Sequence, residues 1–176
     1  IFGVLFDISY LWEEYLATLP ALKDFTHLNN NETAKNKTSL HLATLNRNQA
    51  LRFYPDFYLE TADSQRGNER ASMVVDAKYK RYADHSIRRS DIYQMMGYMH
   101  ALKAPQGILL CPVEQGAKPD GKRYNLKGYG GELGTEFLEI PQQTKPNELT
   151  YDAFRKAMDD SENNLKQRID ELKINH

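Results

Sequence analysis

The sequence predicts an α/β fold, in which helices flank a central mixed β-sheet. Amphipathic helical patterns near both ends and in the middle of the chain, with short apolar strands between them, predict this class. The connections predict the mixed sheet: a hairpin loop joins the strands at 51–61 and 72–80, whereas a helix leads from the second of them to the next strand. Hairpins join antiparallel strands, and helical crossovers join parallel ones.

The first predicted element is an amphipathic helix over 7–19, which Pro20 ends. Its apolar residues form one broad stripe, and Glu13 and Glu14 lie at the flanks of that stripe. Solvation of the helix is the ordinary role of such glutamates. The polar, Asn-rich stretch 27–39 is expected to be a loop.

Strand-forming residues follow. A short strand is expected at 42–45 and a longer one at 51–61, with Pro55 as an irregularity next to Asp56. The strand at 72–80 is apolar at first and ends in charged residues, so it would carry polar groups to the rim of the sheet.

The middle helix is expected at 92–103, with Ser90 as its N-cap. Five of its apolar side chains are expected to face the core: Ile92, Met95, Met96, Met99 and Leu102. Three more strands are expected, at 107–113, 124–126 and 135–140. Glycines between the last two strands turn a hairpin, and a long helix with a charged outer face begins at Thr150.

The chain of 176 residues suits a single domain over 1–176, with a core at about 5–113 and further strands and a helix over 114–176. Because it begins at Ile1, we expect a fragment of a longer protein. The net charge of −1 gives no global sign of nucleic-acid binding, and no apolar run could span a membrane. The single cysteine, Cys111, excludes a cysteine-ligated cluster and is consistent with a cytoplasmic protein.

The candidate site lies where two strands end. Asp76 and Lys78 are two residues apart, so on a strand they share a face, and Asp56 comes from the preceding strand. Carboxylates can hold a hard cation such as Mg²⁺, and a lysine can orient a water molecule and offset anionic charge. The ordinary alternative is a hairpin with a weak surface salt bridge.

Four short motifs in order resemble a known family. Pro55-Asp56, Asp76-Ala77-Lys78 and Gln94 to Tyr98 are similar to the PD-(D/E)XK nuclease signature with its QxxxY element. More narrowly, the opening at 5–15 and the residues around Asp76 resemble McrC, the nuclease subunit of modification-dependent McrBC restriction systems. The resemblance implies a restriction-endonuclease-like α/β/α sandwich and a DNA endonuclease that needs Mg²⁺, for which Mn²⁺ can substitute.

The resemblance also implies roles for individual residues. The metal ligands would be Asp56, Asp76, Glu13 and the carbonyl of Ala77. Lys78 would orient the attacking water and stabilise the transition state, and Gln94 would position Lys78 or a phosphate. Contacts to DNA would come from four residues: Lys80, Arg88, Arg89 and Tyr98.

The implied partners are DNA and an AAA+ GTPase motor, which would bind through a region outside this fragment. A dimer on DNA is possible, and no membrane is involved. Two alternatives remain open. One is another nuclease of the same fold, of exonuclease or repair type, and the other is a catalytically silent scaffold that binds nucleic acid or a protein.

Overall fold

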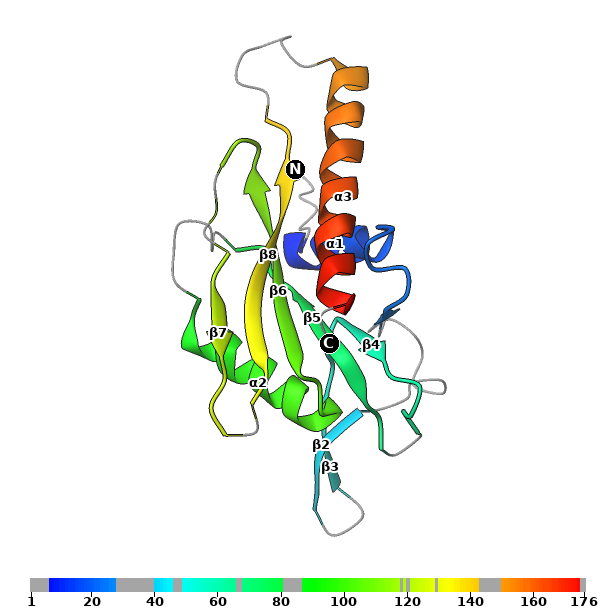
Figure 1. Cartoon of the computed structure of the whole chain (residues 1–176), viewed down its shortest axis with the longest axis vertical. Coiled ribbons are helices and arrows are strands. Elements are labelled where there is room, and N and C mark those ends of the chain that lie inside the picture. The colour runs from blue at the N-terminus through cyan, green and yellow to red at the C-terminus, as the bar shows by residue number, and fades with distance from the viewer. Residues whose placement is uncertain are drawn as a thin grey trace, which may run out of the picture.

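The computed structural model describes residues 7–27, 40–45, 49–65, 68–80, 87–117, 119, 121–128, 130–142 and 150–174. Its elements in chain order are α1 (Ile8–Ala17), β1 (Thr26–His27), β2 (Leu40–Leu45), β3 (Gln49–Phe53), β4 (Phe57–Glu60), β5 (Ala71–Ala77), α2 (Arg89–Leu102), β6 (Gln106–Glu114), β7 (Arg123–Asn125), β8 (Glu132–Ile140) and α3 (Tyr151–Ile174). Six of the strands form a central sheet in the order β1-β4-β5-β6-β8-β7 (Figure 1).

The sheet is mixed, as the connections predict. β4 and β5 pair antiparallel across their hairpin, with Phe57 opposite Val75. α2 then carries the chain over to β6, which pairs parallel with β5 and also with β8. β7 and β8 form the predicted antiparallel hairpin at the far edge.

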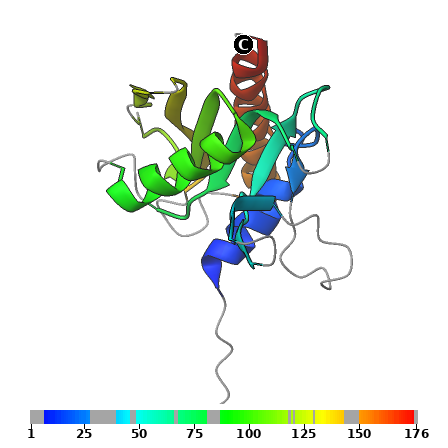
Figure 2. The same ribbon diagram turned by 90° about the horizontal axis from the view of Figure 1, so that it is seen from below.

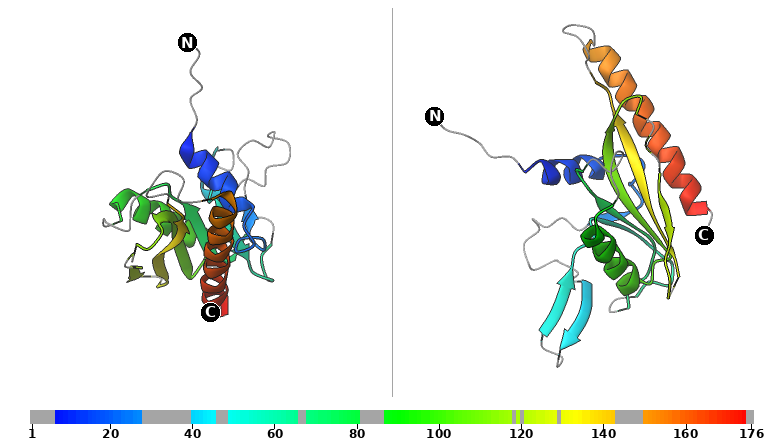
Figure 3. Two further views of the ribbon diagram at one scale, coloured as in Figure 1. Left: turned by 90° about the horizontal axis from the view of Figure 1, so that it is seen from above. Right: turned by 90° about the vertical axis from the view of Figure 1, so that its left-hand side faces the viewer.

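The helices cover both faces of this sheet, which gives three layers (Figures 2 and 3). Alternation along β5 sends Met73 and Val75 to one face and Val74 to the other. The first face packs against α1 and α3, through Trp12, Leu16, Leu165 and Ile169. The second packs against α2 and a separate two-stranded sheet, through Met95, Met99, Leu40 and Phe53. The fold is therefore the predicted restriction-endonuclease-like α/β/α sandwich.

The prediction of a single strand at 51–61 is wrong. The chain forms β3 and β4 there, and β3 pairs with β2 in the separate small sheet. The break falls at residues 54–56, because Pro55 cannot donate a ladder hydrogen bond. Asp56 is thus the last residue before β4 enters the central sheet.

Three local predictions need correction. α2 begins at Arg89, its N-cap position is Arg88, and Ser90 lies inside the first turn. Met96 is 38% exposed and so does not face the core, because it stands one position round the helix from the buried Met95. His27 belongs to β1, and the rest of the loop expected at 27–39 lies outside the described residues.

The apolar stripe of α1 is only partly covered. Trp12 and Leu16 are buried, whereas Ile8 and Leu11 are about half exposed. Cys111 is fully buried in β6, as expected of a small hydrophobe. No helix in the described part of the chain is both long enough and apolar enough to cross a bilayer.

Candidate functional site

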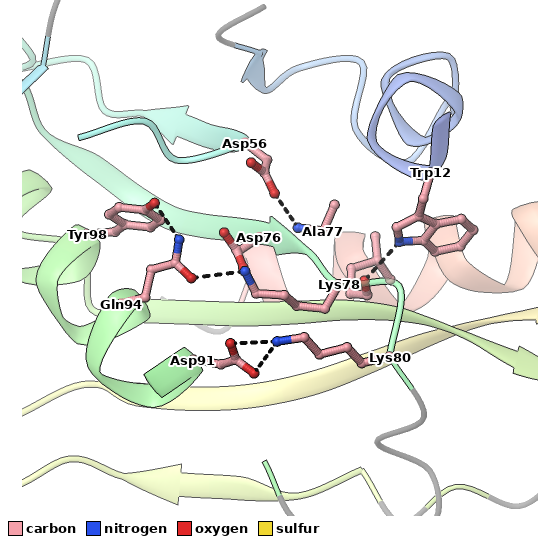
Figure 4. A network of polar contacts seen from close by, with 10 residues as sticks. Trp12, Asp56, Asp76, Ala77, Lys78, Lys80, Asp91, Gln94 and Tyr98 are labelled. Carbon is pink, nitrogen blue, oxygen red and sulfur yellow. Dashed lines mark hydrogen bonds and ion pairs between the residues drawn. The ribbon is translucent and has the colours of Figure 1, made fainter. Parts of the chain in front are cut away.

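The centre of the site is the end of β5, where a buried carboxylate meets a lysine. Asp76 is only 2% exposed, and its Oδ2 lies 2.5 Å from Lys78 Nζ as an ion pair (Figure 4). Lys78 follows the last residue of β5, and its backbone N–H still donates to the carbonyl of Leu110 on β6. This bond continues the strand alternation, so Asp76 and Lys78 share a face as the sequence predicts.

The electrostatics of this pair follow from its burial. Burial raises the pKa of Asp76 above its ordinary value, although Lys78 opposes this effect. For Lys78, burial lowers the pKa, but the carboxylates of Asp76, Asp56 and Asp91 together more than offset burial, so the net shift is upward. Lys78 is therefore an ammonium ion at neutral pH, able to donate hydrogen bonds and to face negative charge.

Asp56 joins the pair from the start of β4. Its Oδ2 accepts a hydrogen bond of 2.6 Å from the backbone N–H of Ala77, which joins the two strand ends (Figure 4). Burial, followed by repulsion from Asp76 and Glu13, raises the pKa of Asp56 to about 8. Three carboxylates that repel one another in a buried place form a site that a cation would stabilise.

Glu13 reaches the same site from α1. Asp7 caps this helix by accepting from the backbone N–H groups of Ser9 and Tyr10, so α1 begins before its acidic residues. Trp12 Nε1 donates to the carbonyl of Leu110 at 3.3 Å and fixes the helix against β6. Burial raises the pKa of Glu13; His27 opposes this effect, and Glu14 and then Asp76 add to it.

Gln94 and Tyr98, both on α2, connect Lys78 to that helix. Four residues apart, they lie on one face of the helix. Lys78 Nζ donates to Gln94 Oε1 at 3.0 Å, and Gln94 Nε2 donates to the hydroxyl of Tyr98 at 2.8 Å (Figure 4). Tyr98 stacks on Phe53 with a ring separation of 5.5 Å. The amide is thus held in one orientation, with its oxygen toward Lys78.

The basic residues expected to meet DNA are in two different situations. Arg88 and Arg89 are exposed at the start of α2. Lys80, by contrast, donates to both carboxylate oxygens of the buried Asp91, each at 2.8 Å. The Lys80–Asp91 ion pair ties the end of β5 to the first turn of α2, so a phosphate would have to compete with Asp91 for Lys80.

Two residues near the site were missed in the sequence. Asp91 reads as an ordinary first-turn acid, and only the structure shows that it is buried against Lys80. His27 lies in a stretch that reads as a loop, yet its ring contacts Asp56 and the two glutamates of α1. No sequence signal marks His27, since the pairing of β1 with β4 brings it there from 29 residues away.

The residues fit a divalent cation in their chemistry. Among the described residues, two buried side-chain polar atoms near the site have neither a hydrogen bond nor a close ion pair: Glu14 Oε1 and His27 Nε2. Asp76 Oδ2 is also buried, and Lys78 Nζ is its close partner. Within the described ranges, no three His, Cys, Asp or Glu side chains are grouped closely enough to hold an ion alone. Mg²⁺ suits such a site, because it is often bound by one or two carboxylates while keeping several waters.

A cavity of about 840 Å³ adjoins this site without containing it. Trp12, Tyr79 and Lys80 line it, together with residues of β6 and α3, but none of the three carboxylates or Lys78 does. The candidate site is therefore defined by charge and burial at the strand ends and not by this cavity.

Comparison with known proteins places the chain in a family. A family model described as "McrBC 5-methylcytosine restriction system component" matches residues 1–112. Among solved structures, the chain matches a half-complex from a tetradecameric assembly of Thermococcus gammatolerans McrB AAA+ hexamers with bound McrC. That match has a TM-score of 0.53 and 13% identity, and it covers 97% of this chain but 34% of the other chain. The chain thus spans about a third of that protein's length.

No curated protein matches the chain. The family match over residues 1–112 includes all four motifs and most of β6, and the structural match supports the fold. The chain belongs to the McrBC family of restriction system components.

Proposed function

We propose that this chain is the cleavage domain of an McrC-like subunit and hydrolyses phosphodiester bonds in DNA with the help of a divalent cation. The observation that carries the proposal is the meeting of Asp56, Asp76 and Lys78 at the strand ends, with Gln94 bonded to the lysine. Buried carboxylates that repel one another cost stability, and such costs are typical of functional sites.

The metal ligands would be Asp56, Asp76 and the carbonyl of Ala77, with Glu13 completing the shell directly or through water. Mg²⁺ is the expected ion, and Mn²⁺ could replace it. When bound, the ion would polarise the scissile phosphate and make a water molecule more acidic. Asp56 would have to lose its proton to bind the ion, since its pKa in the metal-free protein is about 8.

Lys78 would orient the attacking water and stabilise the charge that develops on the phosphate. It is charged, mostly buried and held from two sides, by Asp76 and by Gln94. A donor fixed before the reaction is more effective than a mobile one, because it needs no reorganisation at the transition state. Gln94 would position Lys78, and Tyr98 would keep the amide in its orientation or touch the DNA backbone.

DNA phosphates would meet the exposed Arg88 and Arg89 beside the site. Lys80 would join them only by leaving Asp91. Contacts of this kind set affinity and salt dependence and do not choose the sequence.

The partner would be an AAA+ motor of the McrB type. The solved relative is described as McrB AAA+ hexamers with bound McrC, and this chain matches about a third of the protein chain concerned. We propose that the motor, a GTPase, engages a part of the subunit outside these 176 residues and that the present domain supplies the nuclease. Pairing of two such domains on DNA would allow both strands to be cut.

The test is cleavage of plasmid DNA with Mg²⁺ or Mn²⁺. Asp76→Asn and Lys78→Ala should each abolish cleavage, as should EDTA. Asp63→Asn is the matched control, because this aspartate is exposed and pairs with Arg70 away from the site. If the isolated domain does not cut, the assay is repeated with the full-length subunit, its motor and GTP. Absence of cutting there would favour a non-catalytic scaffold, and equal cutting by all variants would refute the roles proposed for Asp76 and Lys78.

A further inference from the structure

His27 links two of the elements that build the site, although it belongs to neither. It lies in the two-residue strand β1, where it pairs with Phe57 at the start of β4. Its ring stacks on the ring of Phe57, with centroids 4.6 Å apart and planes 21° from parallel. This packing leaves the imidazole half-buried and fixes its orientation, so each ring nitrogen faces one direction.

The first nitrogen holds the main chain of a proposed metal ligand. Nδ1 lies 2.8 Å from the carbonyl oxygen of Asp56. A carbonyl can only accept, so Nδ1 carries a hydrogen and donates it. The bond restrains the peptide of Asp56, whose side chain is itself held by the backbone N–H of Ala77.

The second nitrogen faces the helix that carries another proposed ligand. Nε2 is 3.9 Å from Oε1 of Glu13 and 3.9 Å from Oε1 of Glu14. These distances exceed a hydrogen bond. Both Nε2 and the oxygen of Glu14 are buried without a hydrogen-bond partner. Buried polar atoms left in this way call for an explanation, and the arrangement of a binding site is one.

We propose that His27 is a positioning residue of the metal site: it fixes the Asp56 main chain through Nδ1 and packs the Nε2 edge of its ring 3.9 Å from the Glu13 carboxylate. The inference deepens the proposed function and rests on it. One rigid ring would set the distance between a ligand from β4 and a ligand from α1. Contacts that orient ligands in this way commonly change metal affinity by about 10–100-fold when they are removed.

The test measures metal binding as well as cleavage. His27→Phe keeps a ring able to stack on Phe57 but loses both nitrogens. His27→Asn keeps an N–H donor near the Asp56 carbonyl and loses the group that faces α1. Thr26→Val is the matched control on the same strand, because Thr26 Oγ1 donates to Glu60 at 3.2 Å away from the site. Mn²⁺ affinity is measured by titration with electron paramagnetic resonance, and unfolding curves show that each variant is folded.

We expect His27→Phe to bind Mn²⁺ about 10–100-fold more weakly than the wild type. The Mn²⁺ affinity of His27→Asn should lie between those of His27→Phe and the wild type, and the affinity of Thr26→Val should equal that of the wild type. Cleavage by the His27 variants should recover at saturating Mn²⁺, because a positioning residue acts through the ligands and does not touch DNA. The Mn²⁺ concentration that gives half-maximal cleavage should rise across the variants in the same order as the Mn²⁺ dissociation constant from the titration.

Unchanged Mn²⁺ affinity in His27→Phe would overturn the inference while leaving the proposed function in place. An equal loss of affinity in Thr26→Val would also overturn it, since the effect would then come from disturbance of β1. If the wild type itself binds no Mn²⁺, the inference fails. If, in addition, the full-length subunit with its motor and GTP cuts no DNA, the proposed function fails as well.

Discussion

Replacing Asp56 by Asn should make the metal-free protein more stable above neutral pH. Asp56 is the carboxyl with a pKa of about 8, against 3.8 for the free side chain, because of burial and the repulsion from Asp76 and Glu13. Its pKa in the folded state thus lies above its value in the unfolded chain. The folded state holds the proton of Asp56 more tightly than the unfolded chain does. The contribution of this group to the free energy of unfolding is therefore fully present below about pH 4 and is lost as the pH rises through about 8.

The magnitude follows from that shift. About four pKa units at about 1.4 kcal/mol each give a ceiling of about 6 kcal/mol. Two effects reduce it: the remaining carboxylates of Asp76 and Glu13 still repel each other, and an asparagine oxygen accepts more weakly from Ala77 than a carboxylate does. We therefore expect Asp56→Asn to gain about 1–3 kcal/mol over the wild type at pH 8–9 and little or nothing at pH 4–5.

Urea unfolding in EDTA across pH 4–9 measures this difference, and the single tryptophan, the buried Trp12, provides the fluorescence signal. Asp63→Asn is the control. The pKa of Asp63 is lowered by a hydrogen bond from Thr61 and by Arg70, so its removal should give no gain at high pH. If the stability of Asp56→Asn falls with pH in parallel with the wild type, the carboxylate repulsion inferred for this site is refuted.

Three further predictions concern the surroundings of the site. Lys80→Ala should destabilise the fold by about 1–3 kcal/mol in urea unfolding, because it removes the cation that pairs with the buried Asp91; a double variant with Asp91→Asn should recover part of the loss. Arg88→Ala and Arg89→Ala should each weaken DNA binding and reduce the slope of log affinity against log salt by about 1, measured by fluorescence anisotropy. Trp12→Phe should cost about 1–2 kcal/mol of stability through the lost Nε1 hydrogen bond and lost volume, and a loss below 0.5 kcal/mol would contradict this role.

The sequence predicted the fold class and the elements that carry the site, because these depend on local patterns. The alternation and charge at the end of β5 placed Asp76 and Lys78 on one face, and the four-residue spacing placed Gln94 and Tyr98 together. The structure brings these side chains into contact. Their roles in catalysis and metal binding stay predictions.

The features that could not be predicted depend on contacts between distant parts of the chain. Pro55 predicted an irregularity, but the sequence does not show that β3 lies outside the central sheet, because this depends on its pairing with β2. Asp91 carries a good first-turn signal and is instead buried by Lys80, eleven residues earlier. His27 has no local pattern at all, because its neighbours come from β4 and α1.

The break at Pro55 has a consequence for how this domain can tolerate change. The segment before it forms a hairpin of its own, whereas Asp56 after it is anchored by the N–H of Ala77 and by His27. Insertions between β2 and β3 should therefore leave Asp56, the proposed metal ligand, in register. Changes at the base of the hairpin should not be tolerated in the same way. Phe53 at the base stacks on Tyr98, and Tyr98 is hydrogen-bonded to Gln94, which accepts from Lys78. A molecule bound to the β2–β3 hairpin would therefore be able to shift Lys78, because Phe53, Tyr98 and Gln94 connect the base of the hairpin to this lysine.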